Sequence, residues 1–266
     1  MKARSFKKSL VSIFKGLFLC FLLFIVVAAY ALFIEPTWLK VKTISLHSSP
    51  KVRIVHFSDI HYKGNSNYLA RVVNQINDLK PDCVCFSGDL AEKSEYLDEA
   101  LAVISKINTP MYGCPGNHDH WNTAALDRVS KAFRVTGGEW LVDGSAVLSN
   151  MGVIVTGYGG MRAFDTTVKD TAAITNNSIN ICLAHYPAQA SLVPTNTFDI
   201  ILSGHSHGGQ VRLPFIGALV MPSGVDEYDR GLFNTPAGPL YVTPGLGTFF
   251  LSVRLFCRPE ITVIEL

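Results

Sequence analysis

Nine side chains that could bind a metal or move a proton lie in short motifs along the 266-residue chain. Each motif follows a predicted apolar strand, and most lie beside glycine, serine or proline. Carboxylate, amide and imidazole ligands together suit manganese, iron or zinc better than calcium or magnesium. No cysteine lies within the motifs, which argues against a thiolate zinc site. The nine residues are Asp59, His61, Asp89, Asn117, His118, Asp119, His185, His205 and His207.

The spacing within these motifs favours shared ligands. Asp59 and His61, like His205 and His207, are two residues apart, so an extended backbone places both side chains of a pair on one side. Each motif taken alone could be a turn or a solvated loop. Together they would bury several charges, which is very costly without partners. A pair of metal ions would neutralise those charges.

The first half of the chain predicts elements that bring these motifs together. Apolar runs predict strands over residues 38–46, 52–57, 83–86 and 111–114. Helical periodicity predicts helices over residues 69–79, ended by Pro81, and over residues 97–107. A further polar segment from Trp121 has a helical pattern. Strand–helix–strand alternation predicts a parallel sheet, in which ligands bind beyond the carboxyl ends of strands.

The second half changes to short strands, expected over residues 146–148, 153–156, 179–184 and 200–202. The polar stretch 166–178 is interpreted as a loop or a surface helix. Residues 210–266 predict further strands and loops rich in glycine and proline. The chain contains no linker pattern, so we expect one globular domain over residues 37–266.

Residues 1–36 predict a basic segment followed by a membrane anchor. Gly16–Ile34 contains no charge, and about 20 apolar residues span a bilayer as a helix. We favour an uncleaved single-pass anchor, although a signal peptide cleaved near Ala29-Tyr30-Ala31 and a monotopic helix stay open. Basic residues flank the apolar run on both sides, so the side of the membrane that carries the domain stays open.

Charge and cysteine content exclude other classes of protein. The net charge is +2, but five basic residues precede Gly16, which leaves 18 basic against 21 acidic residues in the rest. This balance argues against a nucleic-acid-binding protein. The six cysteines do not form a disulfide framework in so long a chain. Cys83 and Cys85 alternate on an apolar strand, and we expect them to be buried, reduced thiols.

The motifs, complete and in order from residue 59 to residue 207, resemble the signature of calcineurin-like metallophosphoesterases. Three later stretches resemble the bacterial membrane-anchored or exported branch of that family, which includes UDP-2,3-diacylglucosamine hydrolases. They are residues 208–215, residues 245–247 and residues 254–260.

The resemblance implies a four-layer α/β/β/α sandwich and a site for two divalent metal ions, with manganese preferred. It implies that Asp89 bridges both metals and that His118 is the general acid, with Asp119 orienting its ring. Two such metals lower the pKa of a water and clamp the phosphoryl oxygens. The implied ligands are Asp59, His61, Asp89 and His207 for the first metal, and Asn117, His185 and His205 with Asp89 for the second.

Substrate preference depends on the apolar stretches near the last motif. Residues 213–222, 232–233 and 249–251 could be core strands of a second sheet. Alternatively, they form an apolar rim that contacts a lipid or the bilayer.

Combined with an anchor, an apolar rim favours a lipid-linked phosphodiester or pyrophosphate such as UDP-2,3-diacylglucosamine in lipid A synthesis. A general or cell-envelope phosphodiesterase is the alternative. A non-catalytic module that binds lipid or cell wall is a third reading. Oligomeric state stays open.

Overall fold

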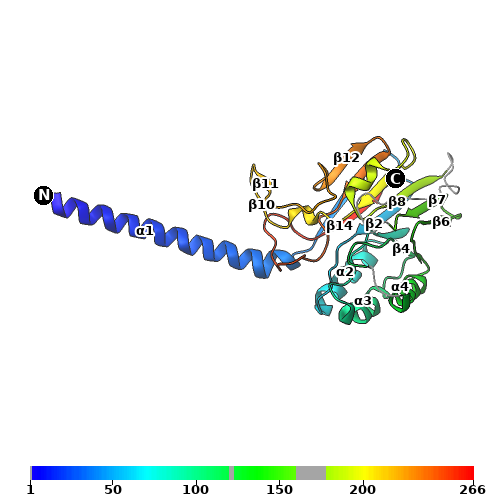
Figure 1. Ribbon diagram of the computed structural model, residues 1–266, viewed down its shortest axis with the longest axis horizontal. Helices are drawn as coiled ribbons and strands as arrows, with labels where there is room; N and C mark the ends of the chain where they lie inside the picture. The colour runs from blue at the N-terminus through cyan, green and yellow to red at the C-terminus, as the bar shows by residue number, and fades with distance from the viewer. Residues whose placement is uncertain (1, 120–122, 160–177) are drawn as a thin grey trace.

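The computed structural model describes residues 2–119, 123–159 and 178–266 (Figure 1). The chain begins with the long helix α1 (Lys2–Ala29), which continues through a π-helical turn η1 (Tyr30–Ile34) and a 3-10 turn η2 (Glu35–Thr37). The stretch Ser12–Thr37 is, by length and composition, long and apolar enough to cross a membrane. Helix α1 projects away from a two-sheet domain.

The first sheet has six strands in the order β1-β14-β2-β3-β4-β5. Neighbours from β2 to β5 are parallel, as the strand–helix alternation predicted, and β14 runs antiparallel to β2. The strands are β1 (Lys40–Ser45), β2 (Arg53–Phe57), β3 (Cys83–Phe86), β4 (Met111–Gly113), β5 (Glu139–Trp140) and β14 (Glu260–Glu265).

Three helices cover one face of this sheet, namely α2 (Ser66–Asp78), α3 (Leu97–Ile104) and α4 (Thr123–Val135). Helix α2 begins where the Asn65 side chain accepts a hydrogen bond from the Tyr68 backbone N–H at 3.1 Å, which satisfies one free donor of the first turn. Helix α3 ends three residues before the predicted limit, and a short 3-10 turn η3 (Ser94–Tyr96) precedes it.

The second sheet also has six strands, in the order β12-β13-β9-β8-β7-β6. Strands β7, β8, β9 and β13 run parallel to one another, whereas the edge strands β6 and β12 pair antiparallel with β7 and β13. The strands are β6 (Gly144–Leu148), β7 (Val153–Gly157), β8 (Ile179–Leu183), β9 (Ile200–Ser203), β12 (Gly231–Thr235) and β13 (Gly238–Val242).

Alternate side chains divide the core into layers. Val55 and Phe57 of β2 pack against the helices, whereas Ile54 faces the second sheet. Cys83 and Cys85 share this inter-sheet layer as buried free thiols, as predicted. A third apolar cluster covers the outer face of the second sheet. In the described part of the chain that outer layer consists of the 3-10 helix η4 (Pro187–Ser191) and loops. The predicted α/β fold, with two packed sheets and helices over the first sheet, is confirmed.

Two predicted features differ from the structure. Residues 213–222 are not core strands of the second sheet, because β10 (Arg212–Leu213) and β11 (Gly217–Ala218) form a separate two-stranded hairpin. Its tip residues Phe215 and Ile216 are exposed, since the hairpin projects beyond both sheets. The short strand β5 was not predicted. The predicted loop or helix at 166–178 lies almost entirely outside the described residues, as does the start of the predicted helix at Trp121.

Candidate metal centre

All nine predicted residues lie at one edge of the two sheets, beyond the carboxyl ends of five strands. Strand β2 leads to Asp59 and His61, β3 to Asp89, and β4 to the turn 116–119. Strands β8 and β9 of the second sheet lead to His185, His205 and His207. His207 itself begins the short 3-10 turn η5 (His207–Gly209). The two sheets therefore contribute opposite halves of one centre.

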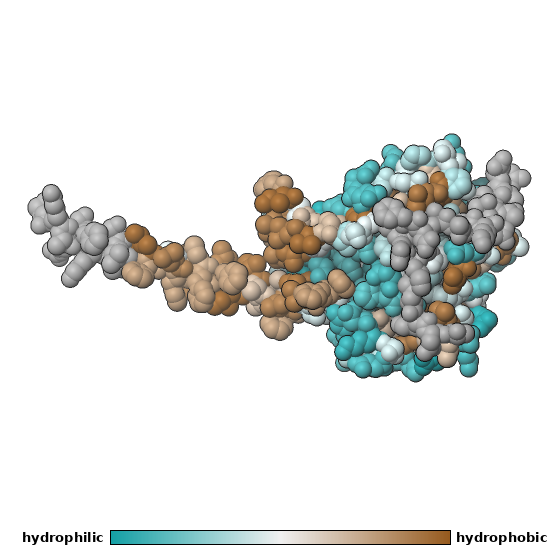
Figure 2. All heavy atoms as spheres, in the orientation of Figure 1, coloured by the Kyte–Doolittle hydropathy of each residue, from teal (hydrophilic) through white to brown (hydrophobic). Residues whose placement is uncertain are grey.

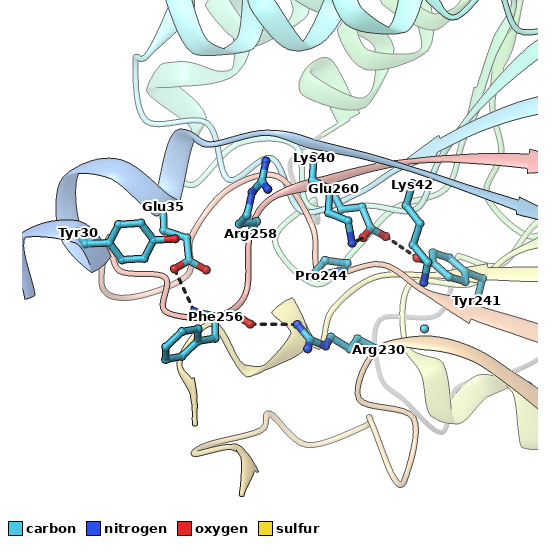
Figure 3. Close-up of a pocket in the computed structure, with 11 residues that line it drawn as sticks. Tyr30, Glu35, Lys40, Lys42, Arg230, Tyr241, Pro244, Phe256, Arg258 and Glu260 are labelled. Atoms are coloured by element: carbon cyan, nitrogen blue, oxygen red, sulfur yellow. Dashed lines mark hydrogen bonds and ion pairs between the residues drawn. The ribbon is translucent and has the colours of Figure 1, made fainter. Parts of the chain in front are cut away.

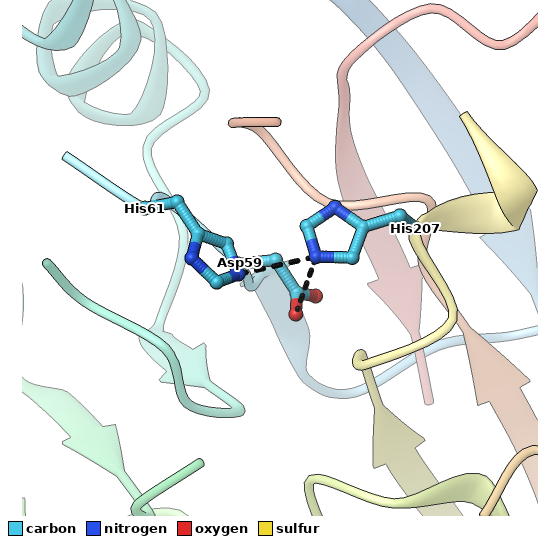
Figure 4. Close-up of side chains that lie close together, drawn as sticks. All are labelled: Asp59, His61 and His207. Carbon is cyan, nitrogen blue, oxygen red and sulfur yellow. Dashed lines mark hydrogen bonds and ion pairs between the residues drawn. The ribbon is translucent and has the colours of Figure 1, made fainter. Parts of the chain in front are cut away.

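The first group of side chains contains Asp59, His61 and His207 (Figure 4). The Nε2 atoms of His61 and His207 are 3.1 Å apart, and His207 Nε2 is 3.6 Å from Asp59 Oδ1. All three side chains are buried. Two ring nitrogens and a carboxylate oxygen thus face the same small volume.

The second group gathers around Asp89. Its Oδ2 atom lies 3.3 Å from His61 Nε2 and 3.4 Å from His185 Nε2, so this carboxylate adjoins both groups. His185 Nε2 is also 3.0 Å from Asn117 Oδ1 and 3.2 Å from His205 Nδ1. The structure therefore brings all seven predicted ligands together, with Asp89 between the two sets.

Hydrogen-bond partners outside this cluster determine which ring nitrogen of three histidines faces the cluster. The Nδ1 atom of His61 lies 2.8 Å from Glu92 Oε2, which leaves His61 Nε2 directed inward. Nδ1 of His185 donates to the Ser87 carbonyl oxygen at 2.7 Å, and Nε2 of His205 donates to the Ser223 carbonyl oxygen at 2.8 Å. Such outer bonds set the tautomer and orientation of metal-binding histidines.

The backbone at these positions adopts an unusual conformation. Asp59, His61, Asp89, His205 and His207 all have φ between 39° and 62°, in the left-handed region that non-glycine residues rarely enter. Backbone strain of this kind persists only where surrounding contacts enforce it, and it is concentrated at functional sites.

Glycines provide the close approach that the turns need. A Cβ atom at Gly116 would collide with the Asp89 carboxylate, and one at Gly88 would collide with the backbone of Gly116. The two loops therefore pack backbone against backbone. This contact brings the turn at 116–119 directly beside Asp89.

The buried carboxylates of the centre need positive charge beside them. Burial alone would raise the pKa of Asp89, but His185 and His61 beside it hold that pKa well below its usual range. Burial also opposes protonation of His61, yet Asp89 and Glu92 raise its pKa to about 10. Burial raises the pKa of Asp59 to about 6. Protons on histidines thus balance the buried carboxylates in the protein alone.

The donor set fits divalent cations. Asp59, His61 and His207, and likewise Asp59, Asp89 and His185, place one ligand atom each within 4.8 Å of one another. Cations at these points would neutralise the buried carboxylates and separate histidine nitrogens that now lie close together. The chemistry of the set, two carboxylates with four imidazoles and an amide, suits manganese, iron or zinc.

The structure gives Asp119 a role different from the predicted one. Its carboxylate is fully buried and accepts backbone N–H groups of Asp89 at 2.6 Å, Leu90 at 2.9 Å and Gly116 at 2.9 Å. Asp119 therefore holds the β3 loop against the β4 loop, because its oxygens bond to the backbone instead of orienting the His118 ring.

His118 lies at the mouth of the centre. Its backbone N–H donates to Asp89 Oδ1 at 2.8 Å, and its ring centroid is 4.8 Å from that of His61. Burial lowers the pKa of His118 below its ordinary value. The ring is half-buried, so it adjoins the cluster and also faces the cleft.

The sequence analysis missed Glu92, and it noted Phe249 and Arg254 only within the stretches 249–251 and 254–260, without these contacts. Glu92 contacts His61 because an isolated bridge pairs Tyr62 with Ala91. Phe249 stacks near His61, His118 and His207, with ring centroids 5.5–6.3 Å apart. Arg254 is fully buried and donates to the carbonyls of residues 244, 245, 247 and 257. These contacts could not be predicted, since each joins residues that are distant in sequence.

A cavity of about 570 Å³ opens beside the metal-binding residues. The part of its lining that contains predicted site residues, called the metal-binding wall below, consists of His61, Asp89, Asn117, His118, His205 and His207. The apolar part, called the apolar wall below, consists of Val211, Leu219, Val220, Met221, Pro222, Phe249, Phe250, Leu251 and Val253.

Comparisons with known proteins agree with this arrangement. The calcineurin-like phosphoesterase family matches residues 52–209, which include every motif described above. Metallophosphoesterase YkuE of Bacillus subtilis is 31% identical, with 89% of this chain and 88% of that protein covered. Phosphodiesterase YaeI of Escherichia coli is 28% identical, with 89% and 92% covered.

Two further similarities are more distant. UDP-2,3-diacylglucosamine pyrophosphatase LpxG of Chlamydia muridarum is 25% identical, with 87% of this chain and 90% of that protein covered. The crystal structure of TT1561 of Thermus thermophilus superimposes with a TM-score of 0.53 at 15% identity, covering 73% of this chain and 90% of that one. The similarity to TT1561 supports the fold alone. With the family match and YkuE taken together, the chain belongs to the calcineurin-like phosphoesterase family and is a phosphoester hydrolase.

Proposed function

We propose that this enzyme hydrolyses a phosphodiester or pyrophosphate bond in a lipid-linked substrate at the membrane surface, such as UDP-2,3-diacylglucosamine. The observation that carries the proposal is the cavity that predicted metal-binding residues and an apolar wall line together. A polar phosphoryl group and an acyl chain would each meet a matching surface there. LpxG, whose name specifies this substrate, supports the proposal at 25% identity.

In this proposal Asp59, His61, Asp89 and His207 hold one divalent metal ion. Asp89, Asn117, His185 and His205 hold the other, and manganese is the preferred metal. Bound ions would lower the pKa of a water and neutralise the phosphoryl oxygens. Glu92 and the carbonyl oxygens of Ser87 and Ser223 bond the outer ring nitrogens of three ligands, so the inner nitrogens of these rings are directed towards the metals.

His118 is the proposed general acid, which protonates the leaving oxygen. The ring lies against His61 and lines the cleft, so it can reach a group held between the two walls. Phe249 packs near the same ring, with centroids 5.5 Å apart, and shields it from water. A half-buried imidazole can donate a proton near neutral pH once a phosphoester's negative charge adjoins it.

The proposed membrane partner is supported by the exposed apolar surface around the cleft. Phe215 and Ile216 at the tip of the β10–β11 hairpin, and Phe250 in the loop that follows Phe249, are exposed. In Figure 2 the hydrophobic hairpin lies at the face of the domain from which the apolar helix emerges. Exposed apolar patches of this kind mark contact with lipid or protein partners.

The helix is also attached to this apolar face. The Arg254 backbone N–H donates to the Ala31 carbonyl at 3.0 Å, and the buried Glu35 carboxylate accepts the Phe256 N–H at 3.0 Å. If residues 1–36 anchor the chain in a membrane, the apolar rim lies at the bilayer surface with them. The cleft then opens where a lipid-linked phosphate is found.

A general phosphodiesterase is the second candidate, favoured by the similarity to YaeI. The two candidates share the metal centre and differ in their use of the apolar wall. A lipid-specific enzyme needs that wall for binding, whereas a general phosphodiesterase does not.

The experiment compares two substrates with the full-length enzyme in uncharged detergent micelles and manganese. We expect release of UMP from UDP-2,3-diacylglucosamine with a kcat/KM well above that for bis-p-nitrophenyl phosphate. Turnover of the soluble diester without UMP release would reject the lipid substrate and leave the general phosphodiesterase. Absence of turnover with both substrates in the metal-loaded protein would reject both.

A further inference from the structure

A second cavity, of about 440 Å³, lies where the N-terminal helix meets the domain (Figure 3). It is separate from the metal centre and contains no metal-binding residue described above. Its walls come from the end of the helix, from β1, and from the segments before β12 and before β14. Four basic side chains line it, Lys40, Lys42, Arg230 and Arg258, against two acidic ones, Glu35 and Glu260.

Both acidic groups are already neutralised or satisfied. Glu260 is buried, accepts bonds from the Tyr241 hydroxyl and the Thr262 hydroxyl, and pairs with Lys40 Nζ at 3.4 Å. Glu35 is buried and accepts the backbone N–H groups of Phe256 and Cys257. The four basic and two acidic side chains therefore leave the cavity with an excess of positive charge.

The remaining three cations retain their charge. Among the described residues, no carboxylate forms an ion pair with Lys42, Arg230 or Arg258. Lys42 Nζ lies 5.1 Å from the Tyr241 ring centroid, and Arg258 stacks on Trp38 at 4.0 Å. Arg230 Nη1 donates one hydrogen bond to the Phe256 carbonyl oxygen at 3.2 Å. Lys42 and Arg230 therefore retain donors for an anion.

From this excess of positive charge we infer that the cavity binds a phosphate group. Phosphate offers several acceptor oxygens, which match the planar donor array of arginine and the point charge of lysine. Convergent like charges repel one another, and a bound anion removes that repulsion. The site would hold the phosphate without hydrolysing it, since it has neither a metal-binding cluster nor a proton donor such as His118.

The position of the cavity indicates two sources for the phosphate. Tyr30 in the last turns of the apolar helix and the exposed Phe256 border its opening, at the level where lipid headgroups would lie. An anionic lipid headgroup is one source, and its binding rests on the proposed membrane anchoring. Free inorganic phosphate is the other, and it does not depend on anchoring.

The test uses the full-length protein in uncharged micelles and calorimetric titration. The probes are dihexanoyl phosphatidylglycerol, dihexanoyl phosphatidylcholine and inorganic phosphate. The double variant Lys42→Gln/Arg230→Gln removes two cavity charges. The control Lys51→Gln/Lys106→Gln removes two exposed charges elsewhere.

We expect phosphatidylglycerol to bind and the cavity variant to weaken its binding at least tenfold, while the control stays within twofold of the original protein. Inorganic phosphate that binds as tightly, with the same dependence on the cavity residues, would assign the site to free phosphate and reject the lipid source. Both variants should hydrolyse bis-p-nitrophenyl phosphate normally, so a failed phosphoesterase assignment is distinguishable from this result.

Two outcomes would overturn the inference. One is that neither anionic probe binds. The other is that binding survives in the cavity variant but is lost in Asp89→Ala, which would place the anion in the metal cleft.

Discussion

The two walls of the cleft are built in different ways. The metal-binding wall lies at the ends of five strands, and its side chains are buried or half-buried. Outer hydrogen-bond partners orient three of its histidines, and five site residues have a left-handed backbone. The apolar wall comes from a two-stranded hairpin and a loop whose Phe250 is 82% exposed. The first wall requires precise positions because chemistry depends on them. The second requires only an apolar surface, so it can change with the substrate.

The largest expected effect comes from breaking the metal-binding wall at Asp89. We expect Asp89→Ala to lower kcat for a soluble diester by about 10³-fold or more, since it removes the carboxylate between both ligand sets. Metal content measured by mass spectrometry should fall with it. Asp98→Ala, at an exposed carboxylate paired with Arg128, is the control. Full activity of Asp89→Ala would reject the bridging assignment.

His118→Ala should separate proton transfer from metal binding. We expect kcat to fall by about 10²–10⁴-fold, the usual contribution of a general acid, with metal content unchanged. A diester with a poor leaving group should lose more rate than the p-nitrophenyl ester, because a good leaving group needs no proton. Exposed His47→Ala is the matched control. An equal loss with both leaving groups would contradict the assignment.

Glu92→Gln tests whether the support behind the metal-binding wall matters. This change removes the charge that bonds His61 Nδ1 at 2.8 Å, so manganese affinity should fall by about 10–100-fold. Saturating manganese should restore most of the activity. Glu95→Gln, at an exposed position, provides the comparison. Affinity that does not change would show that His61 is held by its other contacts.

Phe250→Ser tests the apolar wall. Burying a phenylalanine against an acyl chain contributes about 1.5–3 kcal/mol, so kcat/KM for a lipid-linked substrate should fall by about tenfold or more. The rate with bis-p-nitrophenyl phosphate should stay the same. Val147→Ser on the exposed edge strand β6 removes a comparable apolar group far from the cleft. Equal losses of activity with both substrates would contradict the proposal that the apolar wall serves only to bind lipid.

The smallest effect concerns stability, at His56 behind the metal-binding wall. Burial lowers the pKa of His56 to about 3, while its Nε2 lies 2.8 Å from Ser87 Oγ. Below pH 6.5 the unfolded chain therefore binds a proton that the folded chain excludes. The free energy of unfolding should fall by up to about 1.4 kcal/mol per pH unit as the pH drops from 6.5 towards 3.

The matched variant for this prediction is His56→Gln, which keeps a polar group without the titration. Thermal unfolding between pH 7 and pH 4.5 should show a steeper loss of stability for the original protein than for the variant. Parallel curves would mean that His56 contributes nothing to the pH dependence.

The strand-end ligands could be predicted because each follows a buried strand directly, and strand order then brings them to one edge. The sequence could not distinguish an exposed hairpin from core strands at residues 213–222, because the two share the same apolar composition. Glu92 has no local signal, and Arg254 lies in the recognised stretch 254–260, but the contacts of both depend on the packing of distant loops. The backbone partners of Asp119 in the β3 loop could not be predicted for the same reason.

The left-handed backbone at five metal-binding positions has a consequence for the supply of active enzyme. Each such residue costs on the order of 1–3 kcal/mol, and bound ions stabilise only the folded chain that holds them. Protein made during metal starvation should therefore unfold more often and reach cellular proteases sooner. Metal availability would then govern how much of this hydrolase persists in a cell, as well as how fast each copy works.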